Sequence, residues 1–154
     1  MPTAKTDATR SSALTSRIKL LKLGILSIST APTDHAALRQ ILKDSRWRIA
    51  QARTCKEAIA RLRRKPMPVV ICDSALPDGT WRDVLGQINS LAHPPVLIVT
   101  SRLADERLWA EVLNLGGYNV LAKPFRESEV QHVVSTVWMR EHGQMQQVAT
   151  ASGA

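Results

Sequence analysis

The chain has 154 residues, of which 44% are hydrophobic and 22% are charged, a composition typical of a soluble globular protein of about one domain. Its formal net charge is +8 at pH 7, and no apolar run approaches the roughly 20 residues that a membrane-spanning helix needs. Residues 1–17 have no apolar segment of the kind found in secretory signals, so we expect a cytoplasmic protein.

The positive charge is concentrated in two places. Residues 1–22 carry five cations and one acid, a net charge of +4, and a second cluster runs from Arg61 to Lys65. Basic clusters can bind nucleic acid through its phosphates, but a solvated tail and the C-terminal end of a helix are commoner settings for such charge. No recognition helix or aromatic-basic surface accompanies them. We therefore expect nucleic-acid binding to be non-specific at most and confined to the N-terminal tail.

The two ends of the chain differ from its middle. Residues 1–18 and 143–154 are rich in small and polar residues and are predicted to be flexible tails around a folded domain at 19–142. Cys55 and Cys72 have no metal-binding spacing, and both fall on apolar stretches, so we expect reduced thiols in the core.

Strand and helix patterns alternate five times along the folded domain. Strands are predicted at 25–28, 47–52, 69–72, 96–99 and 118–122. The helical stripes between and after them are led by Leu38, Cys55, Trp81, Leu108 and Val130. Thr54 and Thr80 are predicted N-caps, and Gly116 is a C-terminal stop signal. Such alternation indicates right-handed βαβ units, and unbroken apolar strands indicate a sheet covered on both faces. The sequence therefore predicts an α/β, doubly wound, five-stranded parallel sheet.

Ligands of such sheets bind at the carboxyl ends of the strands. Asp73 ends a buried strand and opens a Pro-Asp-Gly turn, where the alternative role is to accept hydrogen bonds of the turn. Lys123 ends the last strand before Pro124, where it could bind an anion as a compact charge or simply begin a surface loop. Thr100 ends the fourth strand, and Ser29 and Thr30 follow the first.

Taken together, these segments resemble the receiver domains of two-component response regulators. Residues 70–79 read VICDSALPDG, like the phosphoacceptor strand and its loop; residues 99–101 read VTS, like the conserved hydroxyl position; and residues 116–125 read GGYNVLAKPF, like the final strand and its Lys-Pro-Phe signature. The resemblance covers residues 23–140 and implies the flavodoxin-like (βα)5 receiver fold.

The resemblance also implies a chemistry. A histidine kinase would donate a phosphoryl group to Asp73, which would act as the nucleophile. Lys123 and Thr100 would hold the phosphoryl oxygens. Magnesium would bind Asp73 and the backbone carbonyl of Ala75. No other cofactor is expected, and magnesium only if the domain accepts phosphate.

The chain departs from the family pattern at two places. Ser29 and Thr30 replace the pair of acids that holds the metal, and charges 4 Å apart at an effective dielectric of 20 interact by roughly 4 kcal/mol, so the magnesium site is expected to be weak or absent. Asp34 is close in sequence but is expected to cap the next helix. Val120 stands where receivers usually carry an aromatic, and Tyr118 is expected on the same strand face, one pleat away.

Two functions remain open after this comparison. One is a stand-alone atypical receiver that signals through protein–protein interaction, with Asp73 as phosphoacceptor. The other is a pseudo-receiver that binds partners without phosphate or magnesium, which the missing acids favour. Neither is an enzyme. A histidine kinase or another signalling protein is the expected partner, and a homodimer is possible. Without a metal, Lys123 is expected to pair directly with Asp73.

Overall fold

The computed structural model describes the backbone of residues 24–152 and the side chains of residues 24–140. The predicted N-terminal tail lies outside the described residues. Five strands form one sheet in the order β2-β1-β3-β6-β7, and every neighbouring pair is parallel. Their bounds are β1 (Gly24–Ile28), β2 (Arg48–Ala52), β3 (Val69–Asp73), β6 (Val96–Ser101) and β7 (Asn119–Ala122). This is the 2-1-3-4-5 order of flavodoxin-like sheets, so the predicted fold class is confirmed.

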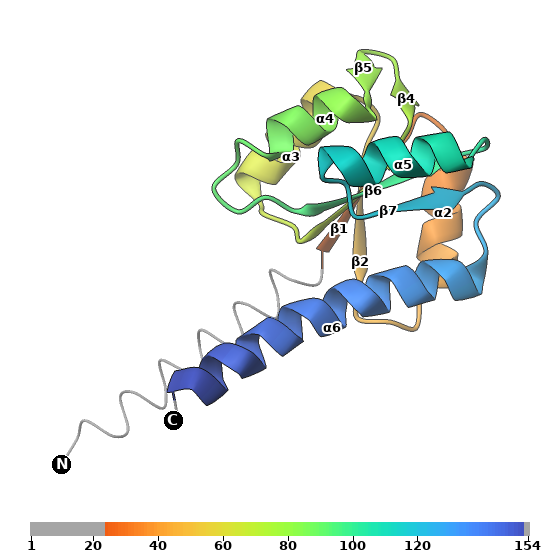
Figure 1. Ribbon diagram of the computed structural model, residues 1–154. Helices are drawn as coiled ribbons and strands as arrows, with labels where there is room; N and C mark the ends of the chain where they lie inside the picture. The colour runs from red at the N-terminus through yellow and green to blue at the C-terminus, as the bar shows by residue number, and fades with distance from the viewer. Residues whose placement is uncertain (1–23, 153–154) are drawn as a thin grey trace.

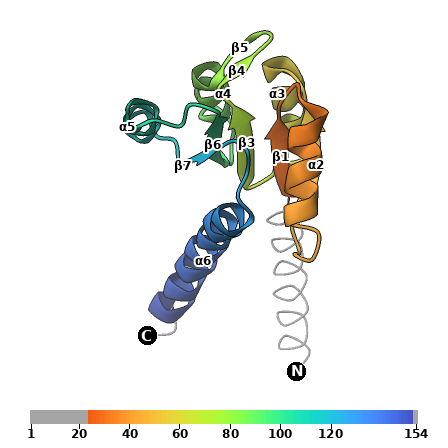
Figure 2. The same cartoon turned by 90° about the vertical axis from the view of Figure 1, so that its right-hand side faces the viewer.

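Helices cover both faces of the sheet (Figures 1 and 2). They are α2 (Pro32–Ile41), α3 (Cys55–Arg64), α4 (Trp81–Ile88), α5 (Glu106–Leu115) and α6 (Glu127–Ser152). One hydrophobic core joins α3, α4 and α5 to the sheet through residues such as Leu26, Val70 and Val99. A second core joins α2 and α6 to the other face through Ile25, Ile71 and their neighbours. The central strands are buried on both sides, which explains why they are apolar without alternation.

The loop after β3 contains a short hairpin that the sequence did not predict. β4 (Ala75–Leu76) and β5 (Gly79–Thr80) pair as antiparallel strands around Pro77 and Asp78. The hairpin stands apart from the main sheet, above α4 in Figure 1. It is only two residues long on each side, which is too short for an alternating pattern to reveal it.

The helix ends predicted at Thr54, Thr80 and Gly116 agree with the structure, and the C-terminal segment differs from its prediction. Thr54 and Thr80 are N-caps, and Gly116 ends α5 in the left-handed conformation with φ of 102°. A flexible tail was predicted from Gly143, whereas the backbone is helical through Ser152. Residues 144–151 are rich in Gln, Met and Ala, which favour helix, and one glycine costs only about 1 kcal/mol. The second half of α6 extends beyond the sheet (Figure 1).

None of the helices among the described residues is both long enough and apolar enough to span a membrane. The two cysteines in this part of the chain are free and buried, as the sequence predicted.

Candidate functional site

The predicted site residues meet at the carboxyl ends of the strands. Asp73 is paired in register with Thr100 across β3 and β6, and the Lys123 Nζ atom lies 3.0 Å from Asp73 Oδ2. Asp73 Oδ1 accepts a hydrogen bond of 3.0 Å from the backbone N–H of Ser74. The predicted direct contact between Lys123 and Asp73 is therefore present. Lys123 precedes Pro124 in a cis peptide bond.

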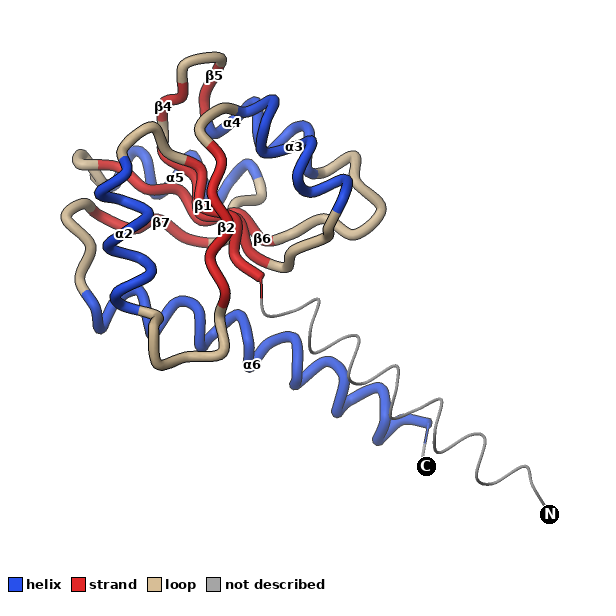
Figure 3. Tube along the Cα trace, turned by 180° about the vertical axis from the view of Figure 1, so that it is seen from behind, coloured by secondary structure: helices blue, strands red, loops and turns tan. Residues whose placement is uncertain are grey.

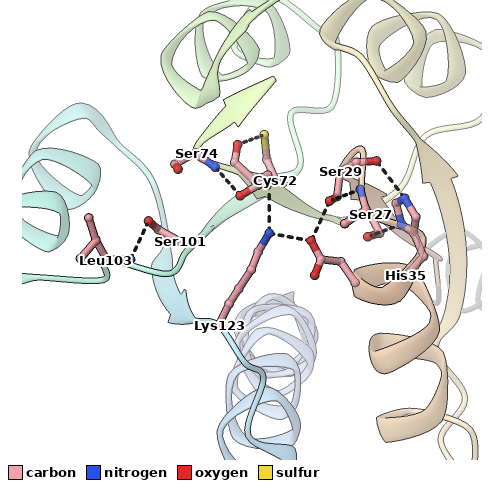
Figure 4. A network of polar contacts seen from close by, with 11 residues as sticks. Ser27, Ser29, His35, Cys72, Ser74, Ser101, Leu103 and Lys123 are labelled. Atoms are coloured by element: carbon pink, nitrogen blue, oxygen red, sulfur yellow. Dashed lines mark hydrogen bonds and ion pairs between the residues drawn. The ribbon is translucent and has the colours of Figure 1, made fainter. Parts of the chain in front are cut away.

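Lys123 contacts a second carboxylate that the sequence assigned to a different role. Its Nζ atom donates to Asp34 Oδ2 at 2.6 Å, and the Lys123 side chain is only 11% exposed. Asp34 lies in the first turn of α2, but its side chain makes no capping bond there. The prediction that Asp34 caps the helix is wrong, because Lys123 and the hydroxyl of Ser29 draw its carboxylate into the site. Figure 4 shows Lys123 between two carboxylate oxygens.

The Asp34 carboxylate is held in its ionised form. Burial raises its pKa, but hydrogen bonds from Lys123 and Ser29 and the positive charge of Lys123 outweigh this, so the pKa lies below its ordinary value. A carboxylate that accepts charge-assisted hydrogen bonds favours the charged form. Asp34 and Asp73 thus share one cation at the centre of the site.

A hydrogen-bond network connects this ion cluster to β1 (Figure 4). Ser29 donates to Asp34 at 2.7 Å and accepts from the backbone N–H of Ala31. The buried imidazole of His35 lies 3.0 Å from the carbonyl of Ser29 and 2.9 Å from the hydroxyl of Ser27. Because a carbonyl can only accept, the Nε2 atom of His35 carries a proton. Ser29, which stands where the family has a metal-binding acid, therefore holds Asp34 in place. The role of His35 was not predicted from the sequence.

The two remaining site positions behave differently. Thr30 is exposed and takes no part in the network. Thr100 is only 2% exposed. Among the described residues its hydroxyl makes no hydrogen bond, although its backbone carbonyl accepts from the N–H group of Ser74. A buried hydroxyl without a partner is uncommon, and this one lies on the strand next to Asp73.

Asp78 of the Leu-Pro-Asp-Gly loop has a structural role. Its carboxylate accepts from the backbone N–H groups of Cys55 and Lys56, at 2.8 and 3.0 Å. These bonds lower its pKa and anchor the β4–β5 hairpin to the start of α3, where backbone donors are otherwise free. The aspartate of the Leu-Pro-Asp-Gly loop is thus explained by its hydrogen bonds to the first N–H groups of α3.

The donors around Asp73 do not suit a magnesium ion. Magnesium prefers several anionic oxygen ligands in an octahedral arrangement. Here the Lys123 ammonium already lies between the two carboxylates. Within residues 24–140, no group of three or more His, Cys, Asp or Glu side chains is placed to hold a metal ion. Ala75, whose carbonyl was the remaining predicted ligand, lies in β4.

The aromatic position next to the site also differs from expectation. Val120 belongs to the core under α3, α4 and α5. Tyr118 packs against the opposite core, where the guanidinium of Arg140 lies 5.7 Å from its ring centre. The prediction that Tyr118 shares a face with Val120 is wrong, because Tyr118 precedes β7 and the alternation of the strand does not extend to it.

Comparison with known proteins agrees with this architecture. The family model described as the response regulator receiver domain matches residues 25–135. The two-component response regulator ORR11 of Oryza sativa is 28% identical over 117 residues, which are 73% of this chain and 79% of that protein. The probable transcriptional regulatory protein TcrX of Mycobacterium tuberculosis is 34% identical over 108 residues, 69% of this chain and 45% of that protein.

Solved structures show the same fold at lower identity. The chemotaxis response regulator CheY4 of Vibrio cholerae has a TM-score of 0.68 at 16% identity and covers 75% of this chain and 98% of its own. A two-component response regulator from Clostridium difficile has a TM-score of 0.69 at 21% identity, with 78% and 98% covered.

Proposed function

Because this chain belongs to the response regulator receiver domain family, we propose that it acts in two-component signalling through protein–protein contacts that do not require phosphorylation of Asp73. The observation that carries the proposal is the shared cation: Lys123 lies 2.6 Å from Asp34 and 3.0 Å from Asp73. In the mechanism that the family resemblance implies, this ammonium would hold phosphoryl oxygens. Here the Lys123 ammonium is already bound to the Asp34 carboxylate.

The contact between Lys123 and Asp34 also fixes the position of the loop after β7. Lys123 follows β7 and Asp34 lies in the first turn of α2, so their contact joins segments 89 residues apart. A partly buried, charge-assisted contact of this kind contributes about 1.5–3 kcal/mol. It holds the loop after β7 against α2 without any ligand. The domain then presents one fixed surface to its partner, a histidine kinase, another signalling protein or a second copy of itself.

A second function is favoured by a different observation. The Asp73 side chain is 22% exposed, and the buried Thr100 hydroxyl beside it has no hydrogen-bond partner among the described residues. Both features suit an incoming phosphoryl group. Under this alternative the chain is a receiver that accepts phosphate on Asp73 and signals through the same kind of protein contact.

One experiment separates the two functions. The full chain is incubated with a small phosphodonor and magnesium, and its intact mass and oligomeric state are measured beside those of Asp73→Asn. We expect neither quantity to change in either protein. A stoichiometric gain of one phosphoryl group with a change of oligomeric state, both lost in Asp73→Asn, would establish the phosphoacceptor function and overturn the proposal.

A further inference from the structure

A groove with basic walls lies at the end of the sheet opposite Asp73. It has a volume of about 600 Å³ and runs between α3 and the first residues of β1 and β2, Gly24 and Arg48. Helix α3 packs directly against these two strands (Figure 3). Asp73 lies at the carboxyl end of β3, whereas the groove lies at the amino ends of β1 and β2. The groove is therefore separate from the ion cluster of Lys123.

The groove is part of the most strongly charged unit of the chain. Residues 48–65 contain seven cations and a single acid, so this unit carries +6 of the total formal charge of +8. The acid, Glu57, is already engaged by Arg61 at 3.6 Å and by the backbone N–H of Arg53. Within the described residues, no ion pair neutralises Arg48, Arg64 or Lys65, all of which line the groove. Such a concentration of unpaired charge attracts anionic partners.

The lining of the groove also has an apolar part. It consists of the buried side chain of Met67 together with Ile49, Ala50 and Ala60. Single-stranded nucleic acid is normally held by aromatic side chains that stack on its bases, and no Trp, Tyr or Phe lines this groove. A lining that combines cationic and apolar side chains instead matches a polypeptide that carries both carboxylates and apolar side chains.

We propose that this groove is a docking site for a short acidic segment of a partner protein. Carboxylates of the segment pair with Arg48, Arg64 and Lys65, and an apolar side chain lies over Met67. Arginine suits this role because its guanidinium binds a carboxylate through two parallel hydrogen bonds. The site works independently of Asp73 and adds a defined contact surface to the proposed function.

Fluorescence anisotropy of the full chain with a labelled peptide of alternating Glu and Leu residues tests the proposal. Arg48→Glu and Arg64→Glu should each weaken binding by about tenfold, as for charges that contact the partner. Arg107→Glu is the matched control, since Arg107 is an exposed helical arginine on α5 with 89% of its side chain exposed. It should change binding by less than about twofold, because α5 packs on β7, at the edge of the sheet opposite β2, and solvent screening weakens the interaction of distant exposed charges.

A neutral variant separates docking from charge attraction alone. Ala60 is exposed on α3, so Ala60→Gln keeps the helix and the charge but narrows the groove, and it should also weaken binding. A peptide with Ser in place of Leu should bind less tightly than the original. The proposal is overturned if Arg107→Glu weakens binding as much as Arg64→Glu, if Ala60→Gln has no effect, or if a single-stranded thymidine oligonucleotide binds more tightly than the peptide.

Discussion

Asp34, in the first turn of α2, supplies a carboxylate that binds the Lys123 ammonium. In the sequence it is one acid in the first turn of a helix, where carboxylates are common for reasons of capping and helix dipole. In the folded chain it bonds to Ser29 and Lys123 instead. It supplies one negative charge to a site from which both acids after β1 are missing, and it does so from α2.

The ion cluster predicts a pH-dependent effect of Asp34→Asn. The pKa of Asp34 is lowered from 3.8, so its contribution to stability is present above that value and is lost as the pH falls through the folded-state pKa. At pH 7 the substitution should lower the free energy of unfolding by about 1–3 kcal/mol. The difference from the unmodified chain should shrink as the pH is lowered below 3.8 in urea unfolding experiments.

Asp44 provides the control for this measurement. It is exposed after α2. Asp44→Asn should change the free energy of unfolding by less than about 0.5 kcal/mol, both at pH 7 and at acidic pH. A loss in Asp34→Asn that is the same at pH 7 and well below pH 3.8 would show that the carboxylate charge is not what stabilises the site.

At the level of single elements, replacing each of two helix glycines by alanine is expected to change stability in opposite directions. Gly86 lies on the exposed side of α4, and a Cβ added there would meet no atom within 4 Å. Gly116 ends α5 with φ of 102°, a conformation that is strained for residues with a side chain. The same chemical change is therefore expected to help at one position and harm at the other.

Gly86→Ala should raise the free energy of unfolding by about 0.5–1 kcal/mol, because alanine loses less backbone entropy in a helix. Gly116→Ala should lower it by about 1–2 kcal/mol through left-handed backbone strain. Chemical denaturation of the two variants, each beside the unmodified chain, measures both effects. A stabilising Gly116→Ala would mean that α5 ends differently in solution.

For the whole molecule, the site centred on Lys123 predicts that thermal stability does not depend on magnesium. A divalent ion would have to displace the Lys123 ammonium from both carboxylates, and Ser29 and Thr30 offer no charge in return. A site that bound magnesium would add about 2.7 kcal/mol to stability at 100 times its dissociation constant. We expect the unfolding temperature to stay unchanged in millimolar magnesium. A rise that Asp73→Ala abolishes would contradict this expectation.

The sequence by itself determined the fold and most of the elements. The alternation of strand and helix patterns along the chain placed all five strands of the main sheet. The central strands are apolar throughout because parallel strands covered on both faces are buried on both sides. Parallel strands also bring their carboxyl ends to one edge, so the meeting of Asp73, Thr100 and Lys123 followed from their positions at strand ends. The caps at Thr54 and Gly116 followed from local preferences that act within one helical turn.

Only the tertiary structure decided which partners these residues choose. Asp34 could cap its own helix or reach Lys123, and the choice depends on how α2 sits against the end of β7, 89 residues away. The same holds for Asp78, which caps α3 rather than its own turn, and for Tyr118, which packs away from Val120. Side-chain hydrogen bonds are short-ranged and directional, so they depend on the final packing of distant elements, which no local sequence pattern records.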